Sequence, residues 1–153
     1  MPDKVEVLLE LYNEHSEWER HHESQRSSVA SILIAVAAGI LGIVTFDGHI
    51  SIVDVPLTAF LTILGCFGAL FSAKQYDRFT LHKERAKQIR EALDRLVPDA
   101  KILKLRDSAD HRYKKNNHLI SRMRLHHFWN TLHILIALVG VILTVGACLH
   151  WFG

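Results

Sequence analysis

The sequence predicts an all-α integral membrane protein with three transmembrane helices and a long antiparallel cytoplasmic helical hairpin between the second and the third. Three apolar stretches occupy residues 27–46, 55–73 and 128–152, and none of them contains Asp, Glu, Lys or Arg. A helix that crosses a hydrocarbon core of about 30 Å needs roughly 20 such residues. A soluble domain of 153 residues rarely buries three helices of this kind. We therefore expect a single membrane domain.

Residues 1–26 predict an amphipathic cytoplasmic helix. Val5, Leu8 and Tyr12 recur at helical spacing, and Glu side chains occupy the other faces. The segment lacks the basic start and the cleavage site of a signal peptide, so we expect the first span to be retained. The helix is expected to begin near Lys4 and is free to continue into the first span.

A short outer loop separates the first two spans. Asp47-Gly48 is a turn signal. Asp54 is expected to cap the second span, because Asp is a preferred N-cap residue. Pro56 then lies in the first turn of that helix, where proline is tolerated. The first two spans then form a hairpin.

Residues 74–127 predict the cytoplasmic hairpin. Apolar residues recur there every three or four positions, which is the spacing of a coiled-coil seam, and a turn is expected at Pro98. The chain must leave the membrane and return to it, so two helices of roughly 24 to 28 residues are expected, the second running to Met123. The seam of the first helix consists of Phe79, His82, Ala86, Ile89, Leu93 and Leu96.

Charge predicts the orientation. Residues 74–127 contain 15 Lys or Arg and seven Asp or Glu, whereas the loop 47–54 contains two Asp and no basic residue. Basic segments stay in the cytoplasm, so the N-terminus and the hairpin should be cytoplasmic and the C-terminus external. Residues 1–26 carry seven acidic and three basic side chains, and they would be able to pair with the basic hairpin within or between subunits.

Small residues at intervals of four predict close helix packing within the spans. Such spacing leaves grooves in which two backbones can approach each other. The pattern favours a homo-oligomer, and packing within one subunit is the alternative. The residues expected to carry it are Ala35, Gly39, Gly42, Gly65 and Ala69.

The sequence contains no pattern that points to catalysis, a cofactor or a metal. No nucleophile lies beside a base, no glycine loop would hold phosphate, and the pairs His21-His22 and His126-His127 point in different directions on a helix. Acidic residues interrupt the basic hairpin, which argues against nucleic acid. Membrane lipid is the expected partner, and anionic lipid would attract nearby Lys and Arg.

The layout resembles small membrane effectors of bacterial conflict systems. It is similar to the SLATT group and to RipA-like octameric membrane proteins, which share a polar N-terminal helix, a two-span hairpin with a short outer loop and a long charged cytoplasmic helix. Retron membrane effectors are similar in size. The chain departs from this pattern by adding the span 128–152. The matching stretch is Leu8 to Leu96, with Trp18, Arg26, Asp47-Gly48, Phe79, His82, Arg85 and Arg90 as its shared features.

This resemblance implies an oligomeric effector in the bacterial inner membrane. Such a toxin would disrupt membrane integrity or form a pore when triggered in antiphage defence, often with a cytoplasmic sensor protein encoded nearby. The alternative is a constitutive membrane scaffold whose basic hairpin docks a partner protein. Overexpression of a toxin should arrest growth, whereas a scaffold should be tolerated.

Overall fold

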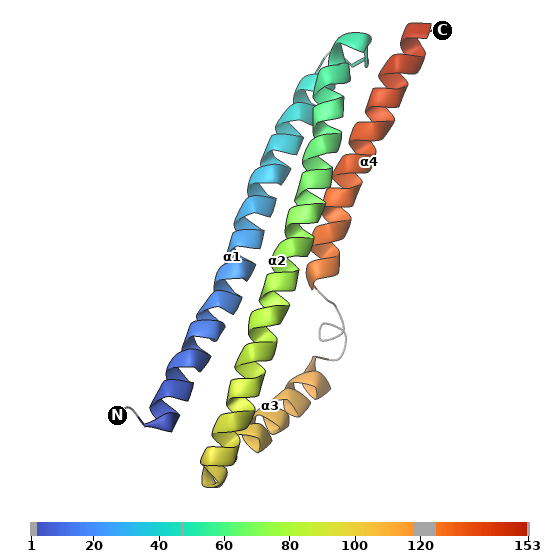
Figure 1. Ribbon diagram of the computed structural model, residues 1–153. Coiled ribbons are helices and arrows are strands. Elements are labelled where there is room, and N and C mark those ends of the chain that lie inside the picture. Colours follow the sequence, from blue (N-terminus) through green and yellow to red (C-terminus); the bar gives the residue numbers. More distant parts are fainter. Residues whose placement is uncertain (1–2, 47, 118–124, 153) are drawn as a thin grey trace. The chain divides into compact units, whose positions relative to one another are not determined.

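The structure, a computed structural model, describes residues 3–46, 48–117 and 125–152. Helices make up nearly all of these ranges, which contain no β-strand, so the all-helical prediction is confirmed. Three of the helices, α1, α2 and α4, contain a stretch long and apolar enough to cross a membrane, as the sequence predicts. In chain order the elements are α1 (Lys4–Val44), the 3-10 turn η1 (Ile52–Asp54), α2 (Val55–Leu96), the 3-10 turn η2 (Pro98–Ala100), α3 (Ile102–Asn116) and α4 (Leu125–Phe152) (Figure 1).

Two of the helices continue from polar into apolar sequence without a break. α1 has the start expected at Lys4 and continues through the first apolar stretch to Val44. α2 begins at Val55, where the second stretch begins, and ends at Leu96, before the proline turn. The Asp54 carboxylate takes part in a cap of η1, where it accepts hydrogen bonds from the backbone N–H and the hydroxyl of Ser51, the residue before this turn.

The second helix of the predicted hairpin is shorter than expected. α3 ends at Asn116, and Asn117 has non-helical backbone angles while its amide side chain donates to the carbonyl of Tyr113. Asn favours such local side-chain bonds over helix continuation. α3 itself has no fully buried residue. The rest of the predicted helix, up to Met123, lies outside the described residues.

The contacts of the chain form two compact units, each built from discontinuous segments. Unit 1 consists of Met1–Ser24 and Tyr76–Arg124, and unit 2 consists of Gln25–Gln75 and Leu125–Gly153. α1 and α2 each contribute one part to either unit, while α3 belongs to unit 1 and α4 to unit 2. The expectation of a single domain stays a prediction.

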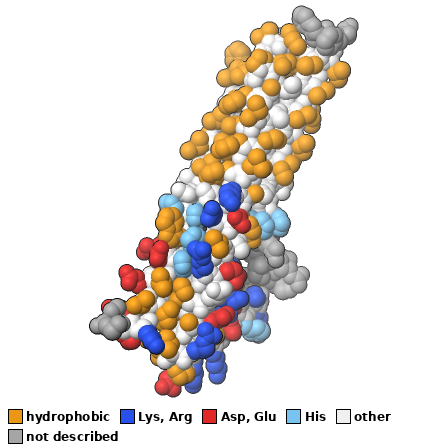
Figure 2. All heavy atoms as spheres, viewed as in Figure 1, with side chains coloured by type: hydrophobic (Ala, Val, Ile, Leu, Met, Phe, Trp, Pro, Cys, Tyr) orange, Lys and Arg blue, Asp and Glu red, His pale blue; other side chains and the backbone are white. Residues whose placement is uncertain are grey.

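Unit 2 packs the apolar parts of α1, α2 and α4 around a small core. The core cluster is Ala37, Ile40 and Val44 of α1 with Leu61 of α2. Partly buried side chains of all three helices, Ile136 of α4 among them, pack against it. Figure 2 shows hydrophobic side chains over the outer face of these segments, as expected for helices that face lipid.

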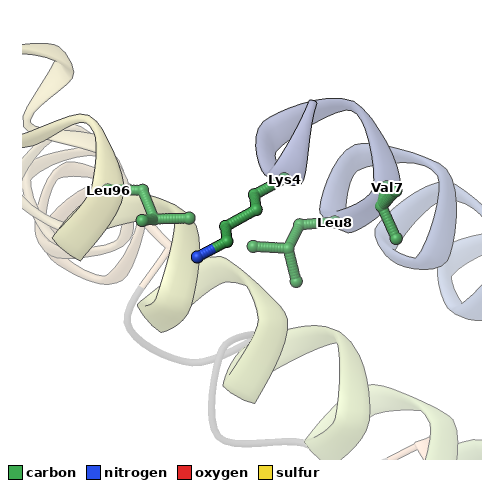
Figure 3. Close-up of a pocket in the computed structure, with 4 residues that line it drawn as sticks. All are labelled: Lys4, Val7, Leu8 and Leu96. Atoms are coloured by element: carbon green, nitrogen blue, oxygen red, sulfur yellow. The ribbon is translucent and has the colours of Figure 1, made fainter. Parts of the chain in front are cut away.

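Unit 1 pairs the first part of α1 with the second part of α2. Of the predicted seam, Ala86 and Leu93 are buried, with 2% and 5% of their surface exposed, whereas Leu96 is 48% exposed. Phe79 and Ile89 are partly buried. Leu96 borders an apolar pocket of about 320 Å³ toward which Lys4 and Leu8 of α1 extend (Figure 3).

Candidate functional site

α2 and α4 approach each other closely in unit 2 because three positions lack a side chain. A Cβ added at Gly65 would overlap the backbone of Ala137, and one added at Gly68 would overlap the ring of His133. On α4, a Cβ at Gly140 would overlap Thr62. The sequence assigns Gly65 to helix packing by its four-residue spacing and places Gly68 and Gly140 inside spans as packing glycines, and the structure brings all three to one interface. What identifies these glycines as one contact is their spacing on two antiparallel helices, and this spacing can be recognised only when the pairing of the helices is known.

Threonine hydroxyls extend this contact toward the N-terminal end of α2. The hydroxyl of Thr144 lies 2.9 Å from that of Thr58, which itself donates to the carbonyl of Val55. Thr58 is fully buried. Successive contacts therefore join the two helices from Thr58–Thr144 to Gly68–His133. An interface of small residues with a polar crosslink is typical of helix association in lipid.

The end of this interface near Gly68 also contains buried polar side chains. Ser72 and His133 are buried, with 1% and 2% of their surface exposed. In the described part of the chain, neither the Ser72 hydroxyl nor His133 Nδ1 has a hydrogen-bond partner. The sequence shows only that His133 lies inside the third apolar stretch. Its burial depends on the space left by Gly68, a pairing that single-helix patterns do not reveal.

The predicted small residues of α1 lie on a different face from the one that packs in unit 2. Ala35, Gly39 and Gly42 are exposed, and apart from the adjoining backbone of α1 no atom of the described residues lies within 4 Å of a Cβ added at either glycine. Ala69 of α2 is partly buried. The packed face of α1 instead follows a heptad-like spacing of Arg26, Ala30, Leu33, Ala37, Ile40 and Val44.

A histidine cluster lies between α1 and α2 in unit 1. His15 Nδ1 and His82 Nδ1 are 3.2 Å apart, and the His22 ring centre lies 5.4 Å from that of His82. Trp18 stacks on both His22 and His82 at 5.9 Å and contacts the edge of His21. Tyr12 lies about one turn before His15 on α1, and Arg90 of α2 donates to the Tyr12 hydroxyl and lies over its ring. The two helices are thus joined by rings.

The environment of His82 disfavours its charged form. His82 lies beyond the apolar stretch 55–73, and its pKa is lowered first by partial burial and then by the positive potential of His15, His22, Arg85 and Arg78. The described residues contain no group of three or more His, Cys, Asp and Glu side chains placed to hold a metal ion. Proton binding and ring stacking are open to this cluster.

The comparisons with known proteins found no match for this chain. No protein-family model and no curated protein matches the sequence, and no solved structure matches the fold.

Proposed function

We propose that this protein is an oligomeric effector of the bacterial inner membrane that disrupts membrane integrity when triggered. The observation that carries the proposal is the open face of α1. Gly39 and Gly42 have no neighbour within 4 Å of a Cβ, and exposed Ile32 and Ile43 flank them. A small-residue face against which no other described segment of the chain packs fits a second helix in lipid. The defence setting rests on the resemblance in layout to conflict-system effectors.

The apolar spans set the kind of leak that such an assembly would make. The three stretches contain no charged side chain, so no charged ring is available to select ions. A passage lined by apolar groups would be controlled by wetting and drying and would discriminate poorly between ions. Loss of membrane potential is the expected outcome.

The charge distribution supports the orientation that this proposal needs. The basic segment 74–127 would lie in the cytoplasm, with the N-terminus on the same side and the C-terminus outside. The antiparallel hairpin belongs to this proposal as well. A hydrogen bond from the backbone N–H of Leu103 to Asp94 supports it by linking the start of α3 to the end of α2.

The experiment is induced expression in bacteria with a voltage-sensitive dye. Expression of the wild-type protein should abolish the membrane potential. If cells tolerate expression alone, the measurement is repeated with a phage trigger and the neighbouring genes present. Gly39→Leu should insert normally and lose most of this activity, because a bulky side chain blocks the open face of α1.

Gly146→Leu is the matched control. Gly146 also has no neighbour within 4 Å of a Cβ, but it lies on α4. This variant should keep the wild-type effect. A wild-type protein that leaves the potential intact with trigger and neighbours present would overturn the effector proposal. Equal loss in both variants would overturn the role of the α1 face.

A scaffold is the second candidate, and α3 is the observation in its favour. None of its residues is buried, and Arg112, Lys114 and Lys115 are exposed at its C-terminal end. Such a surface fits an acidic partner protein. In that case the membrane potential should survive expression, and α3 should be required for co-purification of the partner.

A further inference from the structure

The seam that α1 presents to α2 keeps one spacing along the whole helix but changes its chemistry. In unit 2 the seam residues after Arg26 are apolar and buried, whereas in unit 1 three consecutive seam positions, His15, Glu19 and His22, are ionisable and partly buried. Polar groups at such positions lower the stability of a coiled coil and are retained where they specify something else. The full seam reads Leu8, Tyr12, His15, Glu19, His22, Arg26, Ala30, Leu33, Ala37, Ile40 and Val44.

The contact between His15 and His82 depends on a single proton. Two Nδ1 atoms 3.2 Å apart form a hydrogen bond only if one ring donates and the other accepts. A fully protonated pair has two donors and no acceptor. It also places two positive charges in contact, so acid removes the bond and adds repulsion.

The charges around the pair increase this effect. His22 on α1 and Arg78 and Arg85 on α2 all lower the pKa of His82. The carboxylates nearest these positions on α1 are Glu19, which is itself a seam residue, and Glu23, which follows His22; both are partly buried. A group whose pKa is lower in the paired state binds more protons in the open state. The pairing therefore loses stability as pH falls through the ordinary histidine range and keeps it above that range.

We propose that the histidine cluster of unit 1 is an acid-sensitive latch, which holds α1 against α2 near neutral pH and releases them on acidification. The proposal concerns unit 1 alone and does not depend on the effector function. Histidine is the side chain suited to this task, since its charge changes between about pH 5 and 8.

Hydrogen exchange of the full-length protein in lipid nanodiscs tests the latch. Amides of residues 4–24, corrected for the intrinsic effect of pH, should open several-fold more at about pH 5.5 than at about pH 7.5. Residues 27–44 of the same helix have no ionisable seam side chain and should not respond. His82→Leu should hold the segment closed at both pH values, because leucine suits a seam position.

Two further variants keep the test decisive. His82→Gln has no titratable group and should also remove the response to pH, which covers a failure of the leucine variant to fold. His111→Gln changes an exposed histidine of α3 and should leave the response unchanged. Equal opening of the wild type at both pH values would overturn the proposal. A response that persists in His82→Gln would do the same.

Discussion

The two parts of α1 share one helical spacing, but they place different kinds of side chain at it. From Ala30 to Val44 the seam consists of side chains that cannot change charge. From His15 to His22 the same spacing brings imidazole rings and a carboxylate to α2. Periodicity thus decides which residues face the partner helix, and residue type decides whether that contact responds to its surroundings. α1 therefore combines a permanent seam with one that responds to pH.

α2 shows the matching contrast in how closely helices pack. In unit 2 its contact with α4 relies on missing side chains at Gly65 and Gly68. In unit 1 its contact with α1 is filled by Ala86, Leu93 and stacked rings. Lipid offers no hydrophobic drive for helix association, so close backbone contact is needed in the span, whereas the polar part can bury apolar groups from water.

The largest expected effect is on the glycine contact of unit 2. Gly65→Leu forces a side chain into the backbone of Ala137 and should cost about 3 kcal/mol or more, because the helices must separate. Gly146→Leu makes the same change in open space on α4, away from the α1 face proposed for assembly, and should leave stability unchanged or slightly raised, since leucine favours the helix. Thermal unfolding in detergent measures both. Similar losses in the two variants would mean that the close approach is not what holds α4.

A smaller loss is expected in the seam of unit 1. Leu93→Asp places an unpaired charge at a buried position and should cost about 3 kcal/mol. Leu96→Asp is its control three residues later, where the side chain is 48% exposed, and should change stability by less than about 1 kcal/mol. Circular dichroism melts of the two proteins give the comparison. If Leu93→Asp melts like the wild type, the seam faces solvent.

The contrast also shows what the sequence could predict. The apolar stretches, the start of α1 and the end of α2 follow from local composition, because length, hydropathy and proline act within one helix. The partners of those helices do not follow. Small-residue spacing marked Gly39 and Gly65 alike, yet the structure packs only Gly65 against another helix.

The histidines were hidden for a related reason. The spacing of apolar residues on α2 passes through position 82, so His82 belongs to the predicted seam. The apolar pattern predicted for α1 ends at Tyr12, before His15 and His22. Adjacent histidines at 21 and 22 looked unsuited to act together on one helix. It is pairing with α2 that brings His15 and His22 to His82.

The smallest expected effect concerns the threonine crosslink of unit 2. The Thr144 hydroxyl has one proton and two acceptors within reach, the hydroxyl of Thr58 at 2.9 Å and the carbonyl of Gly140 at 2.8 Å. The crosslink should therefore be weak. A double-mutant cycle of Thr58→Val and Thr144→Val should give a coupling of about 0.6 kcal/mol, the usual size for such bonds in membranes. Thr45→Val is the control, because among the described contacts that hydroxyl bonds only to the carbonyl of Leu41 in the last turn of α1. Pairing Thr45→Val with Thr144→Val should give no coupling. No coupling between Thr58 and Thr144 either would assign the Thr144 proton to Gly140, and the threonine crosslink would then contribute nothing to the contact of α2 with α4.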